Sequence, residues 1–318
     1  MHWGPTASLE TLQQRAALLT ATREYFAETG ALEVETPVLT DTAAPDPHIH
    51  CIRVEDKKWL RSSPEFHMKR VLAAYQTDIY EIGKVFRDKE SGSLHRKEFT
   101  MLEWYRVNFG IEDIINETCH VISLLANTFG KSLEKPHVIT YREAYQNSLG
   151  FDPFTATFQE IRSAADNHFA AEFLSDPGLE KRLGSERSTW LDFIFLKTSQ
   201  SFPRDRLVVM RDFPADQAQL AELNDADPEI ADRFEIFLNQ VELANGYREL
   251  RNPDIQEERF KANNEARKNL GLEPHPDQTD LNDALRHGLP PCSGVSVGLD
   301  RLLMLINDEK KLSGIMTF

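Results

Sequence analysis

The chain has 318 residues, of which 51 are acidic and 36 are basic, so its formal net charge is −15. This length is sufficient for one large domain or two small ones with a substantial buried core. The acidic balance argues against a large nucleic-acid interface, because neutralising phosphates requires clustered Lys and Arg. It suits a basic macromolecular partner, although a generally solvated acidic surface also accounts for it.

The sequence contains no run that approaches the ~20 apolar residues of a membrane-spanning helix. Its N-terminus lacks the basic region and apolar run of a secretory signal. The three cysteines, Cys51, Cys119 and Cys292, are far apart and form neither a disulfide framework nor a zinc motif. We therefore expect a cytoplasmic protein with no membrane partner.

Apolar periodicity, capping residues and Gly or Pro stops predict the elements of the chain. In chain order these are a helix from Ser8 to Gly30, an extended edge segment at 31–39, a short helix at 64–74, strands at 78–86 and 98–106, a helix at 112–129, mostly helical chain from about 140 to 205, a strand at 207–210, a hairpin at 233–246 and a helix from 252 to about 271. We expect one α+β domain over residues 1–318, with an antiparallel β-sheet flanked by helices.

Residues 288–305 predict a strand that runs into a helix. Gly294, Ser296 and Gly298 share one face of this strand, so something must lie close to its backbone. Arg301 follows in the first turn of the helix, where a guanidinium adds to the positive end of the helix dipole. The pattern indicates a nucleotide site, or else a small-residue strand packed on a neighbour with Arg301 in a surface ion pair.

The hairpin at 233–246 carries two glutamates. With Asn239-Gln240 as its two-residue turn, Glu235 and Glu242 become diagonal neighbours on one face. Two like charges at that spacing favour a cation between them, and carboxylate oxygens suit Mg²⁺. Alternatively, both glutamates are merely solvated on an exposed face.

The strand at 98–106 places an aromatic ring, a carboxylate and a phenol on one face. Phe99, Glu103 and Tyr105 alternate there, and such a set suits a purine beside a cationic group. A Phe-Met-Tyr stripe is usually core, but an unpaired carboxylate inside a core is costly. The loop before this strand contains Arg87 and His95, which can both meet phosphate.

Together these segments resemble the class II aminoacyl-tRNA synthetases. Residues 30–39 are similar to motif 1, the dimer-interface segment, residues 85–105 to motif 2, and residues 298–301 to motif 3. Ser63-Pro64-Glu65 with Lys69-Arg70, and residues 242–250, resemble the catalytic domain of lysyl-tRNA synthetase. Only about eight residues precede the first helix, so the N-terminal OB-fold of the tRNA enzymes is expected to be absent.

The phrases at 98–106, 241–247 and 291–295 are more similar to the elongation factor P lysyltransferase family. This resemblance implies an ATP-dependent ligase that activates (R)-β-lysine as an adenylate and joins it to a lysine in the basic acceptor loop of elongation factor P. It implies ATP and Mg²⁺ as cofactors and a homodimer, and it makes tRNA an unlikely partner.

The family's roles transfer to matching positions of this chain. Arg87 and Arg301 would be catalytic, holding the α-phosphate with the substrate carboxylate and the terminal phosphate, respectively. Glu235 and Glu242 would bridge Mg²⁺. The ATP-binding set is Arg87, Asp88, Lys89, Glu90, His95, Arg96, Phe99, Glu242, Leu243, Gly298 and Arg301, with Phe99 stacked on adenine and His95 facing the triphosphate.

The same resemblance implies an amino-acid pocket. Glu65 would hold the backbone-side amino group, and Glu103, Tyr105, Asn245 and Glu249 would surround the side-chain end. Ser63, Pro64, Ala244 and Ser296 complete the predicted set. Ser296 and Ala244 replace glycines of the tRNA enzymes, and the lost volume is expected to disfavour α-lysine and tolerate β-lysine.

Two departures from the family pattern lie in motif 2. Lys89 occupies a position where the family has a glutamate that meets the adenine edge, so either Glu90 substitutes or the backbone reads adenine. The loop at 95–99 lacks the family's proline and gains cations, which would strengthen phosphate contact or reduce activity. Two other functions stay open: a lysine-activating or tRNA ligase without an anticodon module, and a catalytically silent binding paralogue.

Overall fold

The computed structural model describes residues 3–47, 49–89 and 92–318. The chain divides into two compact units, the first made of Met1–Leu133 and Leu243–Phe318 and the second of Glu134–Glu242. The first unit therefore contains both ends of the chain. The backbone returns from the second unit to the first within strand β10.

The first unit contains most of the predicted elements. Its helices and strands are α1 (Leu9–Glu28), β1 (Leu32–Glu33), β2 (Leu39–Thr40), β3 (Ile52–Glu55), β4 (Lys58–Leu60), α2 (Glu65–Tyr75), β5 (Ile79–Phe86), β6 (Glu98–Val107), α3 (Ile111–Asn127), β10 (Val241–Arg248, from Leu243 onward), α9 (Pro253–Asn269), α10 (Thr279–Gly288), β11 (Cys292–Gly298), α11 (Leu299–Ile306) and the 3₁₀ turn η2 (Leu312–Gly314).

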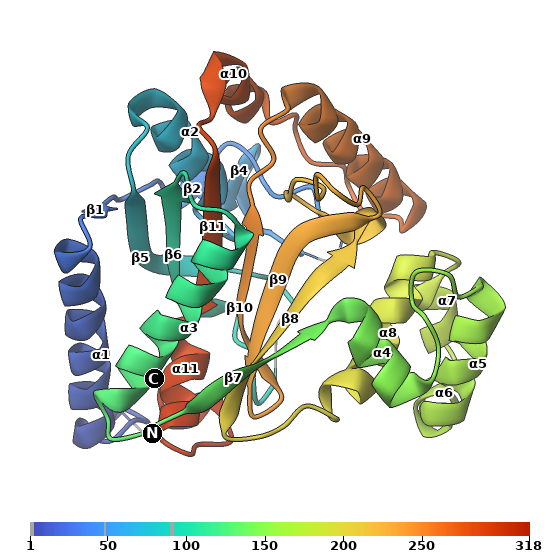
Figure 1. Cartoon of the computed structure of the whole chain (residues 1–318), viewed down its shortest axis with the longest axis horizontal. Helices are drawn as coiled ribbons and strands as arrows, with labels where there is room; N and C mark the ends of the chain where they lie inside the picture. The colour runs from blue at the N-terminus through green and yellow to red at the C-terminus, as the bar shows by residue number, and fades with distance from the viewer. Residues whose placement is uncertain (1–2, 48, 90–91) are drawn as a thin grey trace. The chain divides into compact units, whose positions relative to one another are not determined.

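Strands of the first unit form a sheet in the order β1-β5-β6-β11-β10 (Figure 1). The short edge strand β1 pairs with β5 in parallel, and the pairs β5–β6, β6–β11 and β11–β10 are antiparallel. A separate three-stranded sheet has the order β2-β4-β3. Three sequence-distant segments, 79–107, 243–248 and 292–298, thereby become neighbours.

The central strand β6 separates a helix-covered face from a polar face. Leu102 and Trp104 are fully buried on the first face, where the Trp104 ring lies 5.3 Å from Phe26 of α1. Because strand side chains alternate, Glu103 and Tyr105 point the other way. The candidate site is built on this second face.

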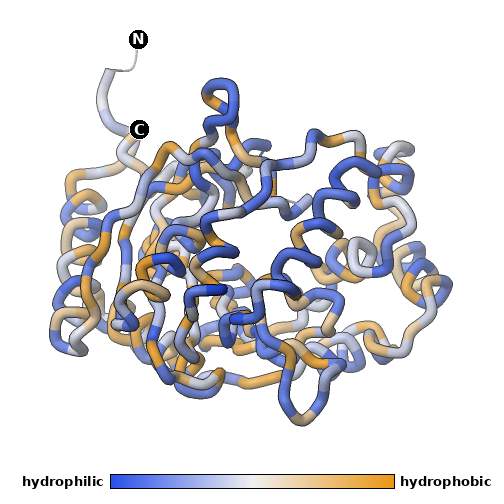
Figure 2. Tube along the Cα trace, turned by 90° about the horizontal axis from the view of Figure 1, so that it is seen from above, coloured by the Kyte–Doolittle hydropathy of each residue, from blue (hydrophilic) through white to orange (hydrophobic). Residues whose placement is uncertain are grey.

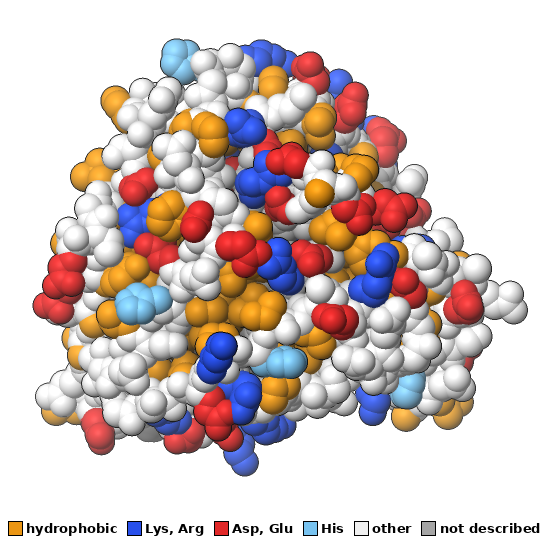
Figure 3. Space-filling view, in the orientation of Figure 1, with side chains coloured by type: hydrophobic (Ala, Val, Ile, Leu, Met, Phe, Trp, Pro, Cys, Tyr) orange, Lys and Arg blue, Asp and Glu red, His pale blue; other side chains and the backbone are white. Residues whose placement is uncertain are grey.

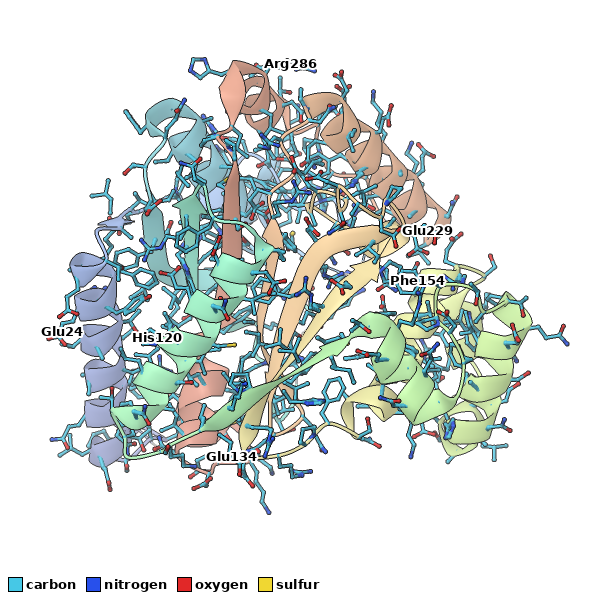
Figure 4. The ribbon with its side chains drawn as sticks, viewed as in Figure 1. Glu24, His120, Glu134, Phe154, Glu229 and Arg286 are labelled. Carbon is cyan, nitrogen blue, oxygen red and sulfur yellow. The ribbon has the colours of Figure 1, made fainter. Side chains whose placement is uncertain are left out.

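A buried ionic network fixes helices α1 and α3 against the sheet. The Glu117 carboxylate on α3 accepts hydrogen bonds from the Trp104 indole, the Tyr25 hydroxyl and the Arg106 guanidinium. His120, labelled on α3 in Figure 4, lies 5.7 Å from the Tyr25 ring of α1. Buried charges are stable only when paired in this way, so the network defines the position of β6 behind the site.

The second unit combines three strands with five helices among its described residues. They are β7 (Glu134–Thr140), α4 (Tyr141–Leu149), α5 (Phe158–His168), α6 (Ala170–Ser175), α7 (Leu179–Leu183), α8 (Arg187–Ser199), β8 (Arg206–Pro214), the 3₁₀ turn η1 (Ala215–Gln217) and β9 (Ile230–Leu238), followed by the start of β10. Strand β8 pairs with β7 in parallel and with β9 in antiparallel orientation. Tyr141, Tyr145 and Trp190 form the centre of its helical core.

The sequence predictions of secondary structure are largely confirmed. Ser8 caps α1 by accepting a hydrogen bond from the Thr11 amide at 3.1 Å. Asn239 and Gln240 both have positive φ, 51° and 70°, as a two-residue type I′ turn requires. The sequence did not predict the edge strand β7 or the small sheet β2-β4-β3.

Hydropathy alternates along the helices in Figure 2, as expected of elements that bury one side. Acidic side chains are scattered over the face shown in Figure 3, with Lys and Arg between them. In the part of the chain that the structure describes, every helix is too short or too polar to cross a membrane.

Candidate active site

A row of polar residues crosses the sheet of the first unit on the face away from α1 and α3. Backbone register pairs Glu103 of β6 with Ser296 of β11, and Ser296 with Asn245 of β10. Side chains in register share a face, so these three predicted substrate residues lie in line. The Ser296 hydroxyl contacts the Asn245 carbonyl at 3.4 Å.

Glu103 is a buried carboxyl group surrounded by donors and other acids. Its oxygens accept hydrogen bonds from Ser63 Oγ at 2.9 Å and from the Tyr105 hydroxyl at 2.7 Å. Burial, together with the charges of Glu65 and Glu249, raises the pKa of Glu103 to about 8, although the two hydrogen bonds act in the opposite direction. In the absence of a bound cation, Glu103 is therefore largely neutral at pH 7.

Two further carboxylates meet at a buried ammonium on α2. Lys69 Nζ lies 2.8 Å from Glu65 Oε1 and 2.5 Å from Glu249 Oε2. Burial alone lowers the pKa of Lys69, but Glu249 and Glu65 outweigh that effect and raise it above its ordinary value. Ser63 Oγ accepts a hydrogen bond from the Glu65 amide at 3.0 Å, just after Pro64, which precedes α2.

Gly294 explains part of the small-residue face of β11. A Cβ at this position would collide with the Tyr105 ring and would lie 2.6 Å from Glu249 Oε1. The group that approaches this backbone is thus a pair of the protein's own side chains. At Gly298, the atoms nearest to an added Cβ would be those of the Arg301 side chain, at ordinary contact distances from 3.8 Å.

From the sequence we predicted that Ala244 contacts the substrate together with Ser296. The strand register corrects this prediction. Ala244 pairs with Val297, which in turn pairs with Leu102. These residues lie on the apolar face, opposite Ser296 and Glu103. The Ala244 side chain therefore points away from the polar row that contains Ser296.

Arg87 and Phe99 lie together where β5 and β6 meet the motif 2 loop. The Arg87 guanidinium lies over the Phe99 ring, 5.3 Å from its centroid, and the Arg87 amide donates to the Lys97 carbonyl at 2.9 Å. Phe99 is half-buried and Arg87 partly exposed. A cation next to an aromatic plane can serve both a phosphate and a base.

The rest of this loop is more open. Asp88 binds Lys97 Nζ at 2.6 Å, while its amide donates to the His50 carbonyl at 2.6 Å. Lys89, with φ of 60°, is exposed, as are His95 and Arg96. The predicted adenine contact Glu90 lies outside the described residues.

Arg301 reaches back to the same loop, because its Nε donates to the Leu94 carbonyl at 3.2 Å. Its neighbour Asp300 is buried, accepts from the Thr100 amide at 2.7 Å and forms an ion pair with Arg15 of α1. Asp300 thus links the start of α11 to the strand that carries Phe99. Sequence reasoning placed Asp300 within motif 3 but gave it no role.

Glu235 and Glu242 belong to the second unit. Burial raises the pKa of Glu235 to about 7, Arg233 opposes this shift and Glu242 adds to it. Arg233 forms an ion pair with Glu235 at 2.5 Å, so the protein itself supplies one cation there. A carboxyl group whose ionisation is resisted by burial and by a second glutamate fits a further divalent cation. Within the described residues, no cluster of three or more His, Cys, Asp or Glu side chains is arranged to hold a metal.

The model of the class II tRNA synthetase family for Asp, Lys and Asn matches residues 4–318. The chain belongs to this family. The predicted fold class, a class II synthetase catalytic fold with a mostly antiparallel sheet, is thereby confirmed, and membership implies the use of ATP.

Three relatives that are similar to this chain have the same name. Elongation factor P–(R)-β-lysine ligase from Vibrio cholerae is 41% identical over 330 positions, covering 99% of this chain and 97% of the relative. Proteins of the same name from Yersinia enterocolitica and Histophilus somni are 35% and 37% identical, covering 99% and 100% of this chain and 97% of each relative. The resemblance drawn from the sequence motifs is confirmed.

The elevated pKa of Glu103 predicts how this carboxyl group titrates. In the ligand-free protein, the ¹³C signal of the Glu103 carboxyl should shift with a midpoint near pH 8, and it should be absent in Glu103→Gln. Tyr105→Phe should move the midpoint higher, because it removes a hydrogen bond that stabilises the carboxylate. A midpoint between 4 and 5 in the wild type would show that the pocket is not desolvated as described.

Proposed function

We propose that the protein is an ATP-dependent ligase that activates (R)-β-lysine as an adenylate and transfers it to a lysine side chain of elongation factor P. The observation that carries this proposal is the buried acidic cluster of Glu65, Glu103 and Glu249. A cluster of carboxylates suits a substrate with more than one ammonium group. The relatives' shared name supports the choice of substrate and acceptor.

In this proposal the amino acid lies along the polar row of the sheet. Glu65 receives the amino group nearer to the carboxylate, and Glu103 and Glu249 receive the distant ammonium. Tyr105 and Asn245 flank the aliphatic chain, and Ser296 limits the space between β6 and β10. Charged hydrogen bonds in a desolvated pocket are strong enough to orient both ends of the substrate.

Adenylation needs positioning and charge stabilisation more than acid or base chemistry. The substrate carboxylate attacks the α-phosphorus of ATP, and pyrophosphate leaves. Arg87 stabilises charge at the α-phosphate and Arg301 at the terminal phosphate, with Phe99 under adenine. Mg²⁺, when bound, would neutralise phosphate charge, and Glu235 and Glu242 are the residues we expect to hold it.

In the second step, the ε-amine of the acceptor lysine attacks the carbonyl of the adenylate. A new amide bond forms, the bond to AMP breaks, and the amine loses its proton. The protein's charge of −15 favours encounter with a basic acceptor loop. Because the pocket already holds the substrate's own ammonium groups, we expect the acceptor lysine to approach from outside it.

We also expect a cytoplasmic homodimer that contacts its partner through residues 30–39. Leu32, Val38 and Leu39 in this segment are 57%, 39% and 44% exposed, so the segment offers apolar surface to a partner. The cysteines are all free, as a reducing compartment requires.

Transfer to the acceptor is the direct test of this function. Incubation with ATP, Mg²⁺ and (R)-β-lysine should increase the mass of elongation factor P by one β-lysyl group, measured by intact-protein mass spectrometry. Arg301→Ala should lose this activity by two or more orders of magnitude, because charge on the departing pyrophosphate is no longer stabilised. Charging of tRNA with α-lysine, without modification of elongation factor P, would identify a lysine–tRNA ligase instead.

We expect the side chain of Ser296 to determine the preference for β-lysine over α-lysine. Ser296→Gly removes a side chain that lies in register with Glu103 and should improve kcat/KM for α-lysine relative to (R)-β-lysine by about tenfold, the scale of one small group in a pocket. ATP–pyrophosphate exchange measures both values. Ala244→Gly is the matched control, because Ala244 faces the apolar side, and an equal shift in this variant would refute the pocket assignment.

Glu242→Gln tests the metal assignment. Removing one carboxylate charge should raise the Mg²⁺ concentration needed for half-maximal adenylation at least about tenfold, while the circular dichroism spectrum stays unchanged. Unchanged Mg²⁺ dependence would exclude Glu242 as a ligand. Glu229→Gln, at an exposed glutamate of the same unit labelled in Figure 4, serves as the control.

A further inference from the structure

The guanidinium of Arg15, on helix α1, contacts two residues that each lie next to a candidate nucleotide-binding residue. It forms an ion pair with Asp300, which directly precedes Arg301. It also donates a hydrogen bond to the Thr100 hydroxyl at 3.4 Å, and Thr100 directly follows Phe99. The Arg15 side chain is 17% exposed and that of Asp300 only 2%, so water screens this pair far less than an ion pair at the surface.

We propose that Arg15 is a positioning residue for ATP: through Asp300 it fixes the first turn of α11, so that the Arg301 guanidinium is directed to the terminal phosphate. This inference rests on the proposed role of Arg301. It extends that role, because neither Arg15 nor Asp300 is assigned a contact with a substrate.

Arg15 reaches the sheet from the face that helices cover. Side chains alternate along β6, so Thr100 shares one face with Trp104, and Phe99 points to the other. Trp104 lies against α1, with its ring 5.3 Å from that of Phe26. Arg15 therefore affects ATP only through the residues to which it is bonded.

Asp300 transmits the position of Arg15 because both of its carboxylate oxygens are used. Oδ1 accepts from Arg15, and Oδ2 accepts from the Thr100 amide at 2.7 Å. A buried carboxylate that rotates away loses one of these partners, which is costly in a protein interior. Asp300 lies in the first turn of α11, so its fixed orientation also restricts the backbone of Arg301.

The Arg301 side chain shows where this restriction is directed. Its Nε donates to the Leu94 carbonyl of the motif 2 loop at 3.2 Å. Bonds between a guanidinium and a phosphate are directional, so a small rotation of α11 weakens them. A purely structural ion pair would instead stabilise the packing of α1 without favouring ATP over AMP, which lacks the terminal phosphate.

Isothermal titration with ATP and with AMP, each with Mg²⁺ and without amino acid, measures this preference. In Arg15→Met the ratio of ATP affinity to AMP affinity should fall about tenfold or more, because a misplacement of ~1 Å can cost up to about a hundredfold. Arg23→Met is the matched control: Arg23 is on the same helix and pairs with Glu33 at 3.0 Å, but the two side chains are 49% and 41% exposed. A wild-type ratio in folded Arg15→Met would overturn the inference.

A second variant separates positioning from stability, since Arg15→Met leaves the buried Asp300 carboxylate without its ion-pair partner. In Arg15→Met/Asp300→Asn that charge is removed, and the new amide oxygen still accepts from the Thr100 amide. The double variant should therefore have a higher Tm than Arg15→Met but the same low ratio of affinities. A wild-type ratio regained together with the stability would contradict positioning by Arg15.

A double-mutant cycle with Arg301→Ala tests whether Arg15 acts through Arg301. It uses Arg15→Lys, which keeps a cation beside Asp300 and so preserves the fold, but replaces the planar fork by one ammonium. Arg15→Lys should lower the ratio of ATP to AMP affinity when Arg301 is present and change it little in the Arg301→Ala background. Equal losses in both backgrounds would contradict the inference.

These outcomes also separate the inference from the function on which it rests. An Arg301→Ala protein that retains the wild-type ratio of affinities contradicts the proposed role of Arg301 itself. A lowered ratio in Arg301→Ala, with no change in the Arg15 variants, contradicts only the inference about Arg15.

Discussion

The burial of two carboxylates at one ammonium, with the third carboxyl group of Glu103 beside them, is the constraint on which the first unit depends. Charges placed in a protein interior are tolerated only when partners lie at hydrogen-bonding distance. Lys69 satisfies Glu65 and Glu249, and Glu103 instead resists ionisation and accepts two hydrogen bonds. The ion pairs of Lys69 and the hydrogen bonds to Glu103 stabilise these acidic groups inside the protein. The groups therefore remain in place to bind a cationic substrate.

The surrounding fold keeps these groups at their distances. Strand β6 carries Glu103 on one face, and on the other it is fixed by the Trp104–Glu117–Arg106 network. Gly294 allows the Tyr105 ring and Glu249 to approach the β11 backbone. Asp300 accepts a hydrogen bond from the Thr100 amide. It thereby connects the first turn of α11, which carries Arg301, with the start of β6, which carries Phe99. The substrate pocket and the candidate nucleotide residues therefore share the same two strands.

Local features of the site could be predicted from sequence because local chemistry determines them. The Asn239-Gln240 turn, the Ser8 cap and the start of α2 at Pro64 follow from residues within one turn of chain. The family motifs also identified the acidic residues that meet in the pocket. The edge strand β7 was missed because its Glu-Lys-Pro-His beginning is too polar for a strand signal.

Features that depend on long-range register could not be predicted. Ala244 was assigned to the pocket because of its neighbours in sequence, but pairing with Val297 turns it to the apolar face. The approach of Tyr105 to Gly294, and the bond between Lys69 and Glu249, join residues more than 140 positions apart in sequence. Only the arrangement of strands and helices shows that Lys69 belongs to the pocket.

The central claim is that this pocket selects an amino acid by its two ammonium groups. The most direct measurement is ATP–pyrophosphate exchange with (R)-β-lysine, α-lysine and norleucine under identical conditions. We predict exchange with the two diamino acids, greatest with (R)-β-lysine, and values for norleucine that are lower by at least two orders of magnitude. Comparable exchange with norleucine would contradict the account, because the acidic cluster would then contribute nothing to selection.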